Sequence, residues 1–134
     1  MRHHMTNLRA LLAVLVALLL PAAAAAQDYA PLDTPLQIRQ VPGAPIYYSI
    51  GNPGVPGKQN QGNTSNADFV VTSDGVVVFD ALGTPSLGWA LLEAIRKVTD
   101  KPVRYVVLSH YHADHIYGLQ AFKDHTQAVI IAQD

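Results

Sequence analysis

The sequence contains no cysteine, few charged residues and no excess of basic charge. The absence of cysteine excludes a disulfide scaffold, a thiolate zinc finger and a cysteine nucleophile within these 134 residues. Lysine and arginine number 9 against 10 aspartates and glutamates, so no basic face for nucleic acid is expected. Charged residues make up 14% of the chain and hydrophobic residues 49%, which argues against intrinsic disorder. A small folded domain, or a piece of a larger one, is therefore expected.

The N-terminus holds the longest apolar run of the sequence. Residues 10–26 are apolar, follow two arginines, and end in alanines of the kind that precede a signal-peptide cleavage site. The run is shorter than the about 20 residues of a membrane-spanning helix, and it contains Pro21. We expect a secretory signal peptide over residues 1–26, a periplasmic or secreted protein, and no stable membrane anchor after cleavage. The alternative is a short membrane anchor.

The next segment, residues 27–62, is rich in proline and glycine. This composition excludes a long helix and predicts an extended lead-in. Within it, the β-branched and aromatic run at 46–50 favours one short strand. More regular patterns begin afterwards, so residues 63–134 are expected to form the folded domain.

Two strands and a helix are expected at the start of this domain. The runs 68–72 and 76–79 are typical of strands, and Asp74-Gly75 between them predicts a hairpin in which both residues tolerate positive φ. Thr84 suits a helix N-cap and Pro85 the first helical position. The apolar residues that follow recur at helical spacing and predict one apolar stripe, formed by Leu87, Leu91, Ile95 and Val98.

The remainder alternates between strand and helix. Pro102 prevents continuation of the helix, and Val103–Leu108 is a nearly continuous apolar run, typical of a strand buried on both faces. A short helix over 119–123 and a last strand over 128–132 follow. A hairpin followed by helix, strand, helix and strand predicts a layered α/β or α+β domain.

Potential metal ligands are concentrated directly after the predicted buried strand. His110, His112, Asp114 and His115 lie within six positions. Alternate residues of an extended segment project to one side, so His110 and His112 can converge on one ion. Asp114 and His115 reach a neighbouring position if the loop turns. Imidazole and carboxylate groups are suitable zinc ligands, so the segment predicts a metal site rather than a hydrophilic loop with incidental histidines.

This motif and its surroundings resemble the metallo-β-lactamase fold hydrolases. His110-x-His112-x-Asp114-His115 follows a hydrophobic strand, and Asn66–Thr72 together with Asp74–Asp80 resemble that family's first strands. The resemblance runs from about residue 63 to the end of the chain. It implies the N-terminal half of an αββα sandwich with a dinuclear zinc site at its edge. Within the superfamily, the chain is most similar to exported members, including zinc metallohydrolases associated with quinoprotein and sulfur-oxidation systems.

The resemblance also implies a role for each residue of the motif. His110 and His112 would bind the first zinc ion, and Asp114 and His115 the second. Asp114 would in addition orient the nucleophilic water or accept its proton. Asp80 matches the family's acidic residue at a strand end, where it supports the metal loop; the alternative is an ordinary aspartate that ends a strand.

The chain departs from the family pattern in its number of ligands. A full domain of this fold supplies one more histidine to each metal and a bridging carboxylate or cysteine from its second half. No histidine follows His125, which is itself expected on the surface, so each zinc would have two protein ligands instead of three. Residues 63–134 are therefore expected to be the N-terminal half of a longer protein, or to depend on a partner chain.

The leading functional hypothesis is an exported zinc-dependent hydrolase. Its paired metals would activate water against an ester, thioester, lactone or amide bond of a small molecule, a β-lactam included. Tyr111 and Tyr117 are candidates to line the site. The 134-residue chain alone is expected to be inactive. The alternatives are a non-catalytic metal-binding fragment, a partner-dependent periplasmic protein and a diiron oxidoreductase, the last disfavoured because such relatives carry an acidic residue at the position of His112.

Overall fold

The computed structural model describes residues 29–133. The expected signal peptide, residues 1–26, lies outside the described residues. In residues 29–133, no helix is both long enough and apolar enough to cross a membrane.

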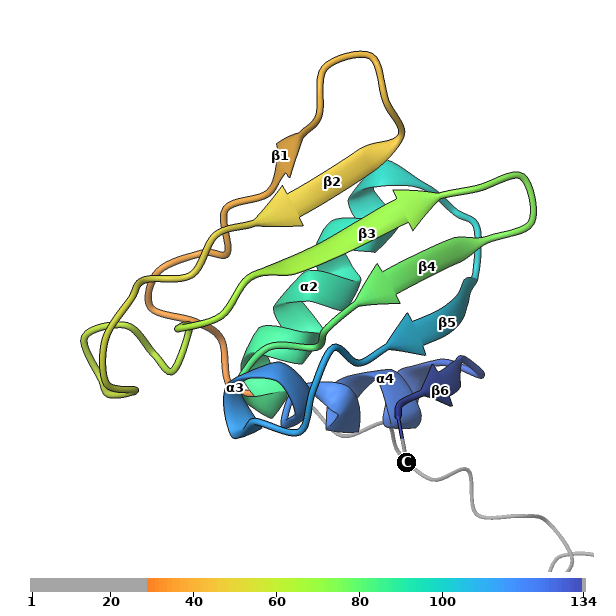
Figure 1. Cartoon of the computed structure of the whole chain (residues 1–134). Helices are drawn as coiled ribbons and strands as arrows, with labels where there is room; N and C mark the ends of the chain where they lie inside the picture. The colour runs from red at the N-terminus through yellow and green to blue at the C-terminus, as the bar shows by residue number, and fades with distance from the viewer. Residues whose placement is uncertain (1–28, 134) are drawn as a thin grey trace, which may run out of the picture.

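A six-stranded mixed sheet organises residues 29–133 (Figure 1). Strands β1 to β4 pair antiparallel, whereas β5 and β6 join by parallel pairing, each after a helical crossover. This arrangement confirms the α+β class expected from the sequence. The strands are β1 (Arg39–Gln40), β2 (Ile46–Ser49), β3 (Ala67–Val71), β4 (Val76–Phe79), β5 (Val103–Val107) and β6 (Val129–Ile131).

Three helices connect the parallel strands: α2 (Pro85–Val98), α3 (Ala113–Ile116) and α4 (Leu119–His125). The predicted start of α2 is confirmed, because the Thr84 hydroxyl accepts a hydrogen bond from the backbone N of Leu87 at 3.1 Å. The predicted apolar stripe is buried as far as Ile95, whereas Val98 in the last turn is 38% exposed. Helix α4 extends two residues beyond the expected 119–123, and α3 was not predicted.

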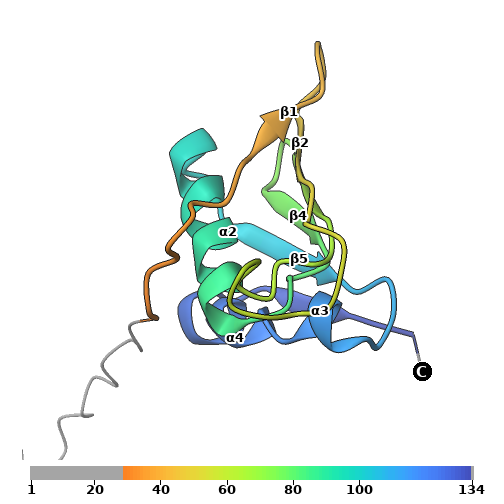
Figure 2. The same cartoon turned by 90° about the vertical axis from the view of Figure 1, so that its left-hand side faces the viewer.

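Helices α2 and α4 lie on one side of the sheet, and the core fills the space between them (Figure 2). Phe69, Val78 and Val106 of the sheet and Leu91 and Phe122 of the helices each have no exposed surface. Close packing of such apolar side chains supplies most of the stability of a layer of this kind.

The other side of the sheet is open, and this corrects one expectation. The strand predicted at 103–108 ends at Val107 and is not buried on both faces. Val106 is fully buried, but the neighbouring Tyr105 is 44% exposed. Successive side chains of a strand point to opposite faces, and within residues 29–133 only one face is covered by helices. The nearly continuous apolar run therefore did not reveal which face is buried.

The lead-in contributes more to the fold than its composition suggested. The strand expected at 46–50 is present as β2, and the unpredicted strand β1 pairs with it. The segment that precedes β1 runs beside α2 (Figure 2). There the Tyr29 hydroxyl donates a hydrogen bond to Asp124 Oδ2 at 2.5 Å.

His125, which was expected on the surface, is only partly exposed and packs against aromatic rings. His125 is half-buried, and its ring centroid lies 4.3 Å from that of Trp89 and 5.9 Å from that of Tyr29. These aromatic partners come from α2 and from the start of the described chain. Because they are distant in the sequence, the local pattern around His125 could not indicate its burial.

Candidate metal centre

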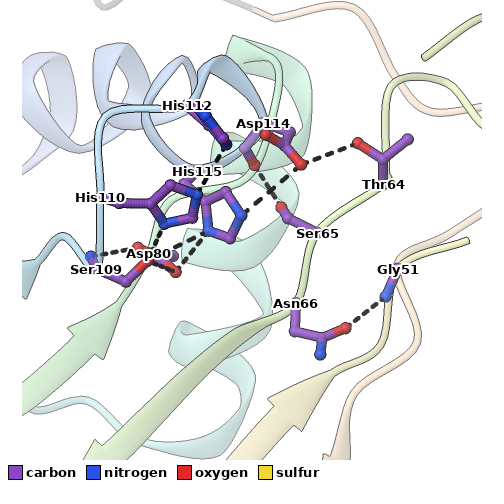
Figure 3. Close-up of polar contacts among 10 residues, drawn as sticks. All are labelled: Gly51, Thr64, Ser65, Asn66, Asp80, Ser109, His110, His112, Asp114 and His115. Atoms are coloured by element: carbon purple, nitrogen blue, oxygen red, sulfur yellow. Dashed lines mark hydrogen bonds and ion pairs between the residues drawn. The ribbon is translucent and has the colours of Figure 1, made fainter. Parts of the chain in front are cut away.

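The predicted site residues meet beyond the carboxyl ends of β4 and β5 (Figures 1 and 3). Asp80 directly follows β4, and His110 lies three residues after β5. Parallel neighbouring strands end at the same edge of a sheet, which brings these two segments together. The short helix α3 then carries Asp114 and His115 back toward the same edge. The site is therefore built at a strand edge from loops anchored in the sheet.

Asp80 is the buried centre of this cluster. It is 8% exposed, and its backbone N donates to the carbonyl of Val107 at 2.9 Å. Its Oδ1 accepts a hydrogen bond from the backbone N of Ser109 at 2.8 Å. Its Oδ2 lies 2.7 Å both from the Ser109 hydroxyl and from His115 Nδ1. The carboxylate thus holds the loop after β5, which fits the supporting role expected for it.

His110 and His112 face each other as their alternate spacing predicts. His110 Nε2 lies 3.1 Å from His112 Nδ1, and both side chains are exposed. Two nitrogens bound to one tetrahedral zinc ion at the usual bond length are separated by about 3.3 Å. The observed separation is close to this value, so the two nitrogens fit a single ion.

Asp114 and His115 form a second pair of donor atoms. Asp114 Oδ2 lies 3.7 Å from His115 Nε2. Because His115 Nδ1 is engaged by Asp80, Nε2 is the ring nitrogen available for a metal. The ring centroids of His115 and His110 are 4.1 Å apart, so the two pairs are adjacent. The turn that the sequence required between His112 and His115 is provided by α3, where the backbone N of His115 donates to His112 O.

The donor set fits zinc in its chemistry, but each pair supplies only two ligands. Imidazole nitrogens and a carboxylate oxygen are ordinary zinc ligands. In the part of the chain that the structure describes, no three His, Asp or Glu side chains are arranged to hold one metal ion. The structure therefore brings together all four predicted ligands as two incomplete pairs.

A hydroxyl clamp on Asp114 is a part of the site that the sequence analysis missed. Thr64 Oγ1 donates to Asp114 Oδ2 at 3.3 Å, and the Ser65 hydroxyl donates to the backbone carbonyl of Asp114. Both residues lie in the loop that leads into β3, which begins at Ala67. Since β3 and β4 form a hairpin, the start of β3 lies at the edge where β4 ends. The β3–β4 hairpin was predicted from the sequence, and it is the one sequence feature that could have indicated that Thr64 and Ser65 lie near Asp114.

Burial raises the pKa of Asp68, and the negative charge of Asp80 raises it further. Asp68 lies in β3 opposite Phe79. Two carboxyl groups, those of Asp68 and Asp80, therefore lie close enough at this edge to interact.

The two tyrosines differ in their relation to the site. Tyr111 is 83% exposed, and its ring lies 4.9 Å from that of His112. It borders a cavity of about 560 Å³, and Tyr117 does not. The residues that line the cavity are Leu108, Ser109, His110, Tyr111, Ile116, Ala132 and Gln133. A mostly apolar pocket thus opens directly beside His110.

Comparison with protein families identifies one match that covers more than half of the chain. The model described as "Metallo-beta-lactamase superfamily" matches residues 61–134. Among curated proteins, a linear primary-alkylsulfatase from Pseudomonas sp. (strain ATCC 19151) is 33% identical over 59 residues. The aligned part is 44% of this chain and 11% of the sulfatase. The chain thus spans about a tenth of the length of this relative.

Solved structures of the same kind share the fold. A metallo-beta-lactamase from Hirschia baltica matches 75% of this chain and 44% of its own, with a TM-score of 0.62 and 20% identity. The metallo-beta-lactamase FIM-1 from Pseudomonas aeruginosa, in its mono-zinc form, matches 76% of this chain and 43% of its own. The TM-score for FIM-1 is 0.57 and the identity 23%. Identities this low show a common fold, and less than half of each neighbour is covered.

Proposed function

The chain belongs to the metallo-beta-lactamase superfamily, and from this premise we propose that it is the N-terminal half of an exported zinc-dependent hydrolase. The proposal rests on the distance of 3.1 Å between His110 Nε2 and His112 Nδ1. The second pair of donor atoms, from Asp114 and His115, lies beside them. Two donor pairs at one sheet edge are what a dinuclear hydrolytic site requires from this part of the fold.

Each side chain has a defined task in this proposal. His110 and His112 would hold the first zinc ion, and Asp114 and His115 the second. Bound zinc would lower the pKa of a water molecule and polarise the bond to be cleaved. Asp80 keeps His115 oriented, and the Thr64 hydroxyl restrains Asp114. Asp114 would also accept the proton of the attacking water.

We propose alkyl sulfate esters as the leading substrate class. Two observations favour them over the other esters, thioesters, lactones and amides that the site chemistry allows. The apolar cavity beside His110 can take a hydrocarbon chain, with Leu108, Tyr111 and Ile116 along its wall. In addition, the curated relative with 33% identity is a linear primary-alkylsulfatase. Hydrolysis would convert an alkyl sulfate and water into an alcohol and hydrogensulfate.

The test is zinc-dependent hydrolysis by the full-length protein. Octyl sulfate below its micellar concentration would be compared with a phenyl ester, a thioester, a lactone and a β-lactam. We expect octyl sulfate to be cleaved fastest, and chelation of zinc to abolish the cleavage. His112→Ala should remove activity and one bound zinc. His125→Ala, a histidine outside the site, should retain both. Zinc-independent turnover, or equal loss in both variants, would contradict the proposal.

A second candidate function follows from the incomplete ligand pairs. With two ligands in each pair, this chain would bind zinc stoichiometrically without turnover unless a further segment or partner completes the coordination. Zinc binding that depends on His110 and His112 but hydrolyses none of the substrates would support this candidate.

Export is also part of the proposal and rests on residues 1–26 alone. The protein recovered from the periplasm should begin at Gln27. An N-terminus at Met1 or Met5 would contradict export by signal-peptide cleavage.

A further inference from the structure

Ser109 links the buried carboxylate of Asp80 to the first histidine pair (Figure 3). The Ser109 hydroxyl lies 2.7 Å from Asp80 Oδ2 and 2.9 Å from His110 Nδ1. Its distance to His115 Nδ1 is longer, 3.5 Å. The backbone N of Ser109 donates to the other oxygen of the same carboxylate at 2.8 Å. Two bonds to Asp80 therefore hold the hydroxyl in place beside His110.

The number of hydrogens that each group can donate determines the direction of the hydrogen bonds around Ser109. A serine hydroxyl has one proton, and an ionised carboxylate can only accept. The Ser109 proton therefore goes to Asp80 Oδ2, and Ser109 Oγ is left to accept from His110 Nδ1. His110 must then carry its hydrogen on Nδ1. In this tautomer the lone pair of the ring is on Nε2, the atom that faces His112.

The same carboxylate acts directly on the second pair. His115 Nδ1 lies 2.7 Å from Asp80 Oδ2, so that nitrogen also carries the hydrogen and donates it. The lone pair of His115 is then on Nε2, the atom nearest to Asp114 Oδ2. Asp80 thus determines which ring nitrogen carries the hydrogen in one histidine of each pair. It acts on His115 directly and on His110 through Ser109.

We propose that Ser109 is a positioning residue that relays the charge of Asp80 to His110 and holds His110 in its Nδ1–H tautomer. The two proposed metal positions are thereby arranged by one buried carboxylate before any metal binds. This inference rests on the metal site of the proposed function. It adds Ser109, which neither the motif nor the family resemblance assigns.

The first experiment reads the tautomers in the metal-free full-length protein by ¹⁵N-edited NMR of the histidine side chains. The unchanged protein should show His110 and His115 with hydrogen on Nδ1. Ser109→Ala should shift His110 toward the Nε2–H form, which is the more stable form in water, and leave His115 unchanged. Asp80→Asn should shift both. Ser109→Thr keeps the hydroxyl and should restore the Nδ1–H form, whereas Ser73→Ala removes an exposed hydroxyl elsewhere and should change neither histidine.

The second experiment measures zinc affinity of the same variants by calorimetry with zinc chloride. Loss of a group that orients a metal-binding histidine usually weakens binding about 10–100-fold. Ser109→Ala should show a loss of this size in one of the two sites, and Ser109→Thr and Ser73→Ala should bind as the unchanged protein does.

The two experiments separate failure of the relay from failure of the metal site. An Nε2–H tautomer at His110 in the unchanged protein, or a Ser109→Ala variant with the same tautomer and zinc affinity, would overturn the relay. Absence of zinc binding by the unchanged protein would overturn the proposed function instead, and the NMR result would still decide the relay.

Discussion

Asp80 has to satisfy two requirements at one position. Both oxygens of its carboxylate take part in hydrogen bonds with Ser109 or His115. Its backbone φ is 61°, in the left-handed region. Aspartate and asparagine tolerate this region better than other residues with side chains. Asparagine satisfies only the backbone requirement, because its amide nitrogen donates rather than accepts. This is why Asp80→Asn is the informative variant: it preserves the turn while it removes the charge.

Tyr29 allows a prediction at the residue scale outside the site. Burial, followed by the hydrogen bond to Asp124 and the charge of Asp124, raises the pKa of Tyr29 to about 12 from the ordinary 10.0. Because the folded pKa is raised, the stabilisation by this contact is complete below pH 10 and is lost as the pH rises through 12. A near-ultraviolet absorbance titration should show one tyrosine that ionises later than the rest.

The control for this prediction is a pair of variants. Tyr29→Phe should remove the late step, and Asp124→Asn should return it toward the ordinary pKa of tyrosine. A titration curve of the unchanged protein without a late step would contradict the prediction.

At the scale of elements, two glycines bring α4 against the loop that carries Asp80. A Cβ built on Gly118 would lie 1.8 Å from the carbonyl oxygen of Ala81, and one built on Gly88 would lie 2.1 Å from that of Gly118. The backbone N of Gly118 donates to Leu82 O at 2.9 Å. The start of α4 thus contacts both α2 and the loop after β4 through backbone alone. Helix packing therefore contributes to the position of the site.

Gly118→Ala should be strongly destabilising because its Cβ would overlap a backbone atom that cannot move aside. We expect a loss of about 3 kcal/mol in the free energy of unfolding, measured by urea denaturation. Gly57→Ala is the control, since its Cβ would meet only the flexible end of the Gln59 side chain. A loss below about 0.5 kcal/mol for Gly57→Ala is expected. Equal stability of the two variants would show that the glycine contact is looser than described.

At the scale of the whole molecule, the described residues form a single sheet with one covered and one open face. Two apolar rows cross the open face in register: Val77, Tyr105 and Val129, and next to them Phe79, Val107 and Ile131. Tyr105 is 44% exposed and Val129 56% exposed. A contiguous apolar surface of this kind is unusual for a soluble monomer.

Matched substitutions on the two faces test this description. Val78→Thr places a hydroxyl in the fully buried face and should cost about 1–3 kcal/mol in the free energy of unfolding of this chain. Val129→Thr makes the same chemical change on the open face and should cost less than about 0.5 kcal/mol. Urea denaturation of the two variants measures the difference. If Val129→Thr lowered the free energy of unfolding as much as Val78→Thr does, the open face of the sheet would be covered in solution.

The sequence by itself determined the features that depend on neighbours along the chain. The N-cap at Thr84, the turn at Asp74-Gly75 and the pairing of His110 with His112 all follow from local spacing, and the structure has each of them. Even there the agreement is partial, since Gly75 has positive φ and Asp74 does not. Periodicity and capping act over a few residues, so they can be read from the sequence.

Only the tertiary structure decided the contacts between distant segments. Ser65 and Asp114 are 49 positions apart, and His115 and Asp80 are 35 apart. No local pattern encodes such contacts, because they arise from strand pairing and from where each loop leaves the sheet. Burial has the same origin: His125 is covered by Tyr29 and Trp89, and Tyr105 is open because helices cover only the other face of its strand.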